Sequence, residues 1–88
     1  MKMYVCAVMD KKVMAYVQPA FFRTKGEATR AFMDAVAAEN SPMRRHAEDY
    51  VFCFLGFYDD HEGRFENAAV PEILMSALDC VAIDGGIN

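Results

Sequence analysis

The stretch Tyr16–Phe32, which reads Tyr-Val-Gln-Pro-Ala-Phe-Phe-Arg-Thr-Lys-Gly-Glu-Ala-Thr-Arg-Ala-Phe, decides how this chain is organised. Pro19 has no backbone N–H to donate to a neighbouring strand, so the strand before it is expected to end there. Thr24 and Glu27 have the spacing of a capping box, in which the Thr oxygen accepts from an amide near the Glu and the Glu carboxylate reaches back. The stretch therefore predicts a turn between a strand and a capped helix that runs to about residues 38–39.

The residues before this stretch predict a β-hairpin. The first strand is an apolar run from Met1 to Met9, interrupted only by Lys2, and the second strand is Val13–Val17. The polar residues Asp10-Lys11-Lys12 between them have the length of a turn. Both faces of the first strand are apolar, which is typical of a central strand that is covered on both sides. One face carries Tyr4, Cys6 and Val8, and the other carries Met3, Val5, Ala7 and Met9.

A third strand is predicted from the longest apolar run, Tyr50–Tyr58. Asn40-Ser41-Pro42 ends the helix, and a polar connection, Met43–Asp49, leads to this run. Gly56 inside the run indicates a bulge or the close approach of another group. Simple alternation places Tyr50, Phe52, Phe54 and Tyr58 on one face and Val51, Cys53, Leu55 and Phe57 on the other.

The end of the chain predicts a short strand and a second helix. Asp59–Gly63 has the composition of a turn, and Arg64–Glu66 would be a short returning strand. Pro71 is expected to open the helix, because the first helical position needs no N–H donor. The apolar stripe of this helix would consist of Ile73, Leu74, Ala77, Leu78 and Val81.

These elements predict one α+β domain over residues 1–88, with the order ββαββα. If Tyr50–Tyr58 pairs with the first strand, the four-stranded sheet is antiparallel with strand order 2-1-3-4, and both helices cover one face. The other face is then too apolar for water, since hydrophobic residues make up 55% of the chain. We therefore expect a homodimer or a larger assembly that forms through this apolar sheet surface.

No pattern in the sequence points to catalysis or to metal binding. Asp59, Asp60, His61 and Glu62 are consecutive, so their side chains diverge, and a solvated turn explains them better than a metal site. The cysteines number three and have no metal-site spacing, which favours reduced and buried thiols. We expect no enzyme, no cofactor and no metal. No apolar run is long enough to cross a bilayer, so we expect no membrane partner.

The best functional clue is the mixture of aromatic and basic residues between Pro19 and Arg30. Phe21 and Phe22 would supply a ring for stacking on a base of single-stranded DNA, and nearby cations would contact phosphates. The alternative is that one Phe packs in the core and the cations are merely solvated, and the residues alone favour this second interpretation. The net charge of −4 means that DNA binding needs a local basic patch. The candidate binding residues are Phe21, Phe22, Arg23, Lys25 and Arg30, with Arg44 and Arg45 as a further pair.

Three segments resemble a known family. They are Gln-Pro-Ala-Phe-Phe-Arg-Thr-Lys-Gly-Glu-Ala-Thr-Arg-Ala-Phe at residues 18–32, His-Ala-Glu-Asp-Tyr at 46–50, and Leu-Gly-Phe-Tyr-Asp-Asp-His-Glu-Gly-Arg-Phe-Glu at 55–66. In order and spacing they are similar to segments of the small non-structural, DNA-binding protein of microviruses of the gokushovirus type. The opening Met-Lys-Met-Tyr-Val also fits.

The resemblance implies a phage accessory protein that binds single-stranded DNA and acts in viral genome replication or packaging, in the host cytoplasm. The alternative is a homodimeric interaction module that recruits replication or capsid proteins without contacting DNA. The salt dependence of DNA binding separates the two, because counterion release makes the first steeply salt-sensitive.

Overall fold

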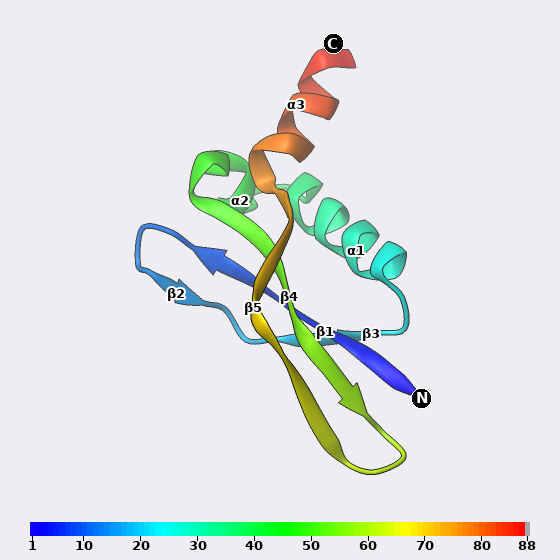
Figure 1. The fold of residues 1–88 in the computed structure, drawn as a ribbon. Coiled ribbons are helices and arrows are strands. Elements are labelled where there is room, and N and C mark those ends of the chain that lie inside the picture. The colour runs from blue at the N-terminus through cyan, green and yellow to red at the C-terminus, as the bar shows by residue number, and fades with distance from the viewer. Residues whose placement is uncertain (88) are drawn as a thin grey trace.

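The computed structural model describes residues 1–87, with side chains described through residue 82. Figure 1 shows β4 and β5 as a long curved hairpin beside β1, with α1 alongside the sheet and α3 continuing beyond the end of β5. The elements are β1 (Lys2–Asp10), β2 (Ala15–Tyr16), β3 (Ala20–Phe22), α1 (Lys25–Ala37), α2 (Pro42–Arg45), the 3-10 turn η1 (Ala47–Asp49), β4 (Tyr50–Asp59), β5 (Arg64–Ser76) and α3 (Ala77–Ile87).

The sheet is antiparallel and has the predicted order, β2-β1-β4-β5. β1 pairs with β4 along its whole length, from Lys2 opposite Asp59 to Asp10 opposite Tyr50. The expected fold class, α+β with an antiparallel sheet built from two strand-and-helix units, is confirmed.

The first hairpin differs from the prediction near Pro19. The expected strand Val13–Val17 is reduced to Ala15–Tyr16, and the chain rejoins β1 after the proline as β3, where Phe21 lies opposite Val5. Pro19 therefore interrupts the pairing with β1 but does not end it. Pro19 alone lacks an N–H donor, so the chain can pair with β1 again after it. The helix after it is capped as expected: the Glu27 N–H donates to Thr24 Oγ1 at 3.0 Å.

The expected helix from Pro71 is wrong, and so is the short strand that ends at Glu66. Residues 64–76 form one long strand, and Pro71 lies within it, on the outer strand of the sheet where the missing N–H is tolerated. α3 begins only at Ala77, because Ser76 and Asp79 cap each other: the Ser76 N–H donates to Asp79 Oδ2 and the Asp79 N–H to Ser76 Oγ, both at 3.0 Å. The polar connection at residues 43–49 also contains helical turns, α2 and η1.

A bulge at Leu55 changes which side chains share a face of β4. Phe54 lies opposite Cys6 and Gly56 opposite Val5, so Leu55 is an extra residue in the strand. The bulge was anticipated from Gly56, but its effect on the faces was not. Phe57 joins Phe54 on the helix-covered face and Tyr58 moves to the opposite face, which reverses the prediction for both rings.

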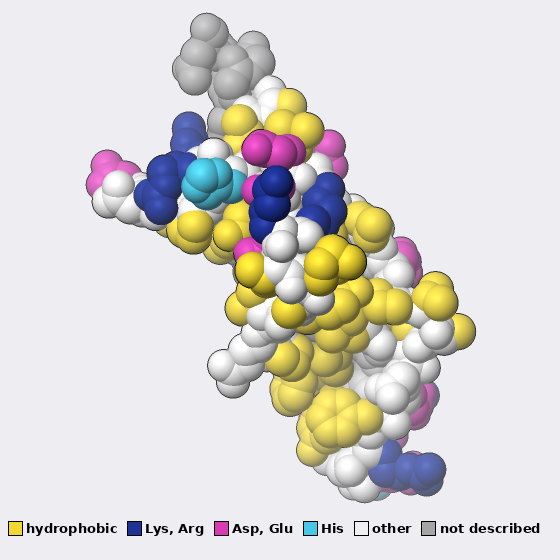
Figure 2. All heavy atoms as spheres, turned by 90° about the vertical axis from the view of Figure 1, so that its left-hand side faces the viewer, with side chains coloured by type: hydrophobic (Ala, Val, Ile, Leu, Met, Phe, Trp, Pro, Cys, Tyr) yellow, Lys and Arg dark blue, Asp and Glu magenta, His cyan; other side chains and the backbone are white. Residues whose placement is uncertain are grey.

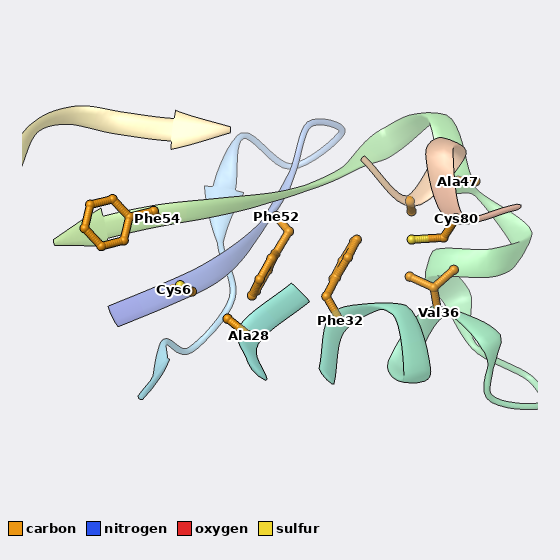
Figure 3. Close-up of a cluster of buried hydrophobic side chains, with 9 residues drawn as sticks. Cys6, Ala28, Phe32, Val36, Ala47, Phe52, Phe54 and Cys80 are labelled. Carbon is orange, nitrogen blue, oxygen red and sulfur yellow. The ribbon is translucent and has the colours of Figure 1, made fainter. Parts of the chain in front are cut away.

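One core holds the sheet and the helices together, as Figure 3 shows. Phe32 of α1 stacks on Phe52 of β4, with ring centroids 4.8 Å apart and planes 6° from parallel. All buried helix side chains of the described residues belong to this cluster, so α1 and α3 cover the same side of the sheet. Its members are Cys6, Ala28, Phe32, Val36, Ala47, Phe52, Phe54, Ala77 and Cys80.

All three cysteines are buried, as the sequence predicts. Burial raises the pKa of the Cys6 thiol to about 11 and also raises the pKa of Cys53. Both thiols therefore stay protonated at neutral pH, and they act as small apolar side chains. Among the described residues, no helix is long and apolar enough to cross a membrane.

Candidate nucleic-acid interface

Phe21 and Phe22 lie on opposite faces of the sheet, because successive side chains in a strand alternate. Phe22 is half-buried on the helix-covered side, and its ring meets the ring of Phe52 edge-on at 6.3 Å. Phe21 lies on the other side, which we call the open face, with 45% of its surface exposed. Of the two candidate stacking rings, Phe21 is therefore the one that a ligand can reach.

Phe21 belongs to a group of three rings on the open face, called here the open triad and made of Phe21, Tyr58 and Phe65. Phe21 stacks on Tyr58 with centroids 5.4 Å apart and planes 16° from parallel, and Tyr58 touches Phe65 at 4.9 Å. The centroids of Phe21 and Phe65 are 6.2 Å apart, and Phe65 is 60% exposed. The triad brings together β3, β4 and β5, and it presents a wide aromatic surface to solvent.

Sequence reasoning missed Tyr58 and Phe65 as members of this site. A signal for the pair was present, since counting outward from the turn at Asp59–Gly63 puts Tyr58 opposite Phe65 in an antiparallel hairpin. Their meeting with Phe21 depends on the bulge at Leu55, which turns Tyr58 to the open face.

A small hollow of about 110 Å³ adjoins Phe65. It is lined by Val5, Leu55, Gly56, Phe57, Phe65 and Asn67. The lining is mostly apolar, and Asn67 adds one amide that can both donate and accept a hydrogen bond. A planar ring that stacks on Phe65 would therefore lie beside the Asn67 amide.

The predicted cations are all exposed: Arg23 precedes α1, and Lys25 and Arg30 lie within it. Lys25 Nζ lies 3.5 Å from Glu72 Oε2 and 5.7 Å from the centroid of the Phe54 ring. The backbone N–H of Arg23 donates to Glu27 Oε1 at 2.8 Å. Because Glu27 already places a carboxylate at this helix end, phosphate binding here would depend on the cationic side chains.

Arg44 and Arg45 lie in α2, beyond the opposite end of α1. Arg45 Nη1 donates to the carbonyl of Asn40 at 3.1 Å. α1 has 13 residues, which corresponds to about 20 Å of helix. The predicted site residues therefore fall into two regions: residues 21–30 at the start and first half of α1, and Arg44 with Arg45 beyond its end.

The turn beside the open triad is acidic. Asp59 Oδ1 accepts hydrogen bonds from the N–H groups of His61 and Glu62, and these bonds lower the pKa of the Asp59 carboxyl. The described residues contain no group of three or more His, Cys, Asp or Glu side chains placed to hold a metal ion. Asp59 directly follows Tyr58 of the triad, so its carboxylate would repel a polyanion at this edge.

Comparison with known proteins places the chain in a family. The model of the family described as "Phage ORF5 protein" matches residues 3–80, which is most of the sequence. The chain belongs to the phage ORF5 protein family. It is 33% identical to Protein ORF5 of Chlamydia phage 1 over 69 residues, a match that covers 74% of this chain and 72% of the relative. Membership in the ORF5 family makes it a small phage protein of the microvirus kind. No solved structure matches it.

The ORF5 family match covers the whole candidate interface. Residues 3–80 include Phe21, Tyr58 and Phe65 of the open triad and the basic residues at both ends of α1. Which of these side chains touch nucleic acid is not specified by family membership, so the assignment of the site residues stays a prediction.

Proposed function

We propose that this ORF5 family protein binds single-stranded DNA and serves as an accessory protein in phage genome replication or packaging. The observation that carries the proposal is the open triad. Three large rings in mutual contact are kept at the surface of a small protein, where burying them in the core would stabilise the fold. Exposed rings on a sheet are the usual means of stacking the bases of a single strand.

The path of the strand follows from the charges around the triad. A base stacked on Phe21 has Arg23 close along the chain, and Lys25, whose ammonium group lies near the Phe54 ring on the helix-covered side, follows at the start of α1. Asp59 and Asp60 lie on the other side of Phe21, directly after Tyr58. The backbone would therefore run from Phe65 across Phe21 toward the start of α1. Arg30 lies further along that helix.

Fluorescence anisotropy with a labelled oligothymidine and with a duplex of equal length, at two salt concentrations, tests the proposal. The single strand should bind more tightly, and the logarithm of its affinity should fall as salt rises. Replacing both Arg23 and Lys25 by Ala should reduce the slope of this plot by about 1.4, since each phosphate contact on a single strand contributes about 0.7. Binding that is absent, or that is independent of salt, would contradict the proposal.

A matched control separates the rings of the interface from exposed apolar side chains in general. Leu78→Ala removes another exposed apolar side chain, 51% exposed on α3, outside the interface. It should leave the affinity unchanged, while Phe65→Ala should weaken binding without changing the salt slope.

The second candidate function is a homodimeric module that recruits replication or capsid proteins without contacting DNA. The net charge of −4 and the acidic turn next to the open triad favour it. In this case the wild-type protein would show no salt-dependent binding to either oligonucleotide, and the open triad would form a protein contact.

A further inference from the structure

The segment between β1 and β3 protrudes from the sheet and is apolar. We call residues 11–17 the arm, and every residue in it is exposed. Val13, Met14 and Val17 have 66%, 76% and 52% of their surfaces exposed. The arm is attached mainly by the two residues of β2 and by the bond from the Val17 N–H to the Val8 carbonyl. Its apolar side chains therefore contribute little to the core of their own chain.

Met14 at the tip of the arm has a left-handed backbone, with φ at +59°. This conformation closes the loop between Asp10 and Ala15, which pair with each other. Gly, Asn and Asp adopt it readily, whereas a long side chain such as Met is disfavoured there. The backbone of Met14 closes the loop, but its exposed side chain contributes nothing to the core of this chain, which points to a contact outside it. Met side chains are well suited to such contacts because they adapt to irregular surfaces.

An apolar hollow lies at the base of the same arm. Its volume is about 290 Å³, and it is lined by Val8, Asp10, Val17, Pro42, Met43 and Tyr50. Figure 2 shows hydrophobic side chains gathered on this side of the molecule, with Lys, Arg and His side chains above them. Asp10 and Asp49 also line the adjoining hollow with Lys12, His46 and Tyr50.

The acidic and basic groups of this region are complementary between copies. The arm begins with Lys11 and Lys12, the hollow that an arm would enter is bordered by Asp10, and Asp49 lines the adjoining hollow. An arm that places Met14 in the hollow of another copy therefore carries its two cations toward the carboxylates.

We propose that two copies of this chain form a dimer by exchanging arms, with Met14 of each copy inserted into the hollow bordered by Val17, Pro42 and Met43 of the other. Val17 belongs to the arm and also lines the hollow, so the inserted group and its receptor are neighbours in one chain. This closeness allows a two-fold axis to satisfy both contacts at once and closes the assembly at two copies. The proposal specifies the partner as a second copy and the surface as the arm, and it does not depend on DNA binding.

Sedimentation equilibrium across a micromolar concentration range tests the proposal. The wild type should be a dimer. Met14→Asn suits the left-handed backbone and keeps the fold, yet it should raise the dimer dissociation constant about 100-fold or more, because two apolar side chains are lost from the interface. The matched control, Val70→Asn, changes a residue that is 71% exposed on β5 and should leave the dissociation constant unchanged.

A mixing experiment then distinguishes arm exchange from any other dimer. Val17→Asp blocks the hollow but keeps Met14, whereas Met14→Asn keeps the hollow. Each variant alone should be monomeric, and an equimolar mixture should recover dimers that contain one intact contact. A monomeric wild type, a dimer that survives both substitutions, or a dimer lost on Phe65→Asn instead would overturn the proposal. Neither variant alters the residues proposed for DNA binding, so the two proposals can fail separately.

Discussion

Two groups of three aromatic rings lie on opposite faces of the same part of the sheet. The open triad of Phe21, Tyr58 and Phe65 faces solvent. The group of Tyr4, Phe54 and Phe57 faces the helices and is called here the buried triad, because Phe54 is buried and Tyr4 and Phe57 are half-buried against the core. Centroid distances in the buried triad are 4.9–5.7 Å, close to the 4.9–6.2 Å of the open triad.

The two groups differ in how far other parts of the protein cover their rings. Phe54 is only 9% exposed, and the ion pairs Lys2–Glu66 and Lys25–Glu72 border its face of the sheet. Phe65 is 60% exposed. Ring contacts of similar geometry therefore serve folding on one face and remain available to a ligand on the other, and the difference lies in the surrounding elements.

The largest expected effect comes from breaking the buried triad. Phe54→Ala should lower the free energy of unfolding by about 3–5 kcal/mol, since it removes a buried ring and leaves a cavity. Phe65→Ala in the open triad should cost less than about 1 kcal/mol, because its ring is already largely in water. Urea denaturation of both variants measures the contrast, and equal losses would mean that the open triad is also part of the core.

The second comparison concerns Gly56 in the bulge, which determines that Phe57 lies in the buried triad and Tyr58 in the open triad. Gly56 has φ at +149°, and a Cβ there would lie 2.4 Å from the Glu66 carbonyl oxygen. Gly56→Ala should therefore cost about 3 kcal/mol or more, from backbone strain and crowding together.

Gly63 provides the matched control for this substitution. It also has positive φ, at +68°, but a Cβ would meet nothing within 4 Å. Gly63→Ala should cost only about 1–2 kcal/mol, the price of the left-handed backbone alone. Thermal unfolding of both variants measures the difference, and similar melting temperatures would show that crowding at Gly56 is relieved by movement of β5.

Phe21 and Phe22 provide a comparison between adjacent residues. Phe21→Ala should weaken single-strand binding by about 1–3 kcal/mol with little change in stability, because its ring lies in the open triad. Phe22→Ala should mainly destabilise the fold, because its ring packs against Phe52. Anisotropy titrations together with urea melts separate the two effects, and a folded Phe21→Ala that binds normally would remove Phe21 from the site.

Lys25 tests how the buried triad is covered, because its side chain lies over the Phe54 ring. Lys25→Met keeps an apolar stem over the Phe54 ring and removes the exposed ion pair with Glu72. The free energy of unfolding should change by less than about 1 kcal/mol, and the change should shrink further at high salt. A loss that persists in 1 M salt, measured by urea denaturation, would indicate that the ammonium group matters for packing.

The smallest effect is expected at Asp59, next to the open triad. Its pKa is lowered in the folded protein by the His61 and Glu62 N–H groups, so its stabilising effect is present above its unfolded pKa of about 3.9 and lost as the pH falls through the folded pKa. The difference in melting temperature between wild type and Asp59→Asn should therefore shrink between pH 5 and pH 2. A difference that stays constant over this range would mean that the charge is unimportant.

Local signals in the sequence were sufficient for several elements. The Thr24–Glu27 spacing predicts where α1 begins, since a cap is satisfied within one turn, and the apolar runs predict β1 and β4. The antiparallel order also follows from these strands, and Gly56 indicates the bulge. Ser76 and Asp79 carried a similar capping signal for α3, but Pro71 suggested an earlier start.

Tertiary structure decided the features that depend on pairing between distant segments. Pro71 lies in an irregular stretch of β5, and β4 pairs with β5 on both sides of it, at Asn67 and at Glu72. This pairing with a distant segment accommodates the proline, and a prediction from neighbouring residues alone does not include it. The position of the extra residue Leu55 is determined by the register between β1 and β4, and a shift of one residue moves a side chain to the other face. That register sends Phe57 to the core and Tyr58 to the open face, and so Phe21, Tyr58 and Phe65 meet although they are far apart in the sequence.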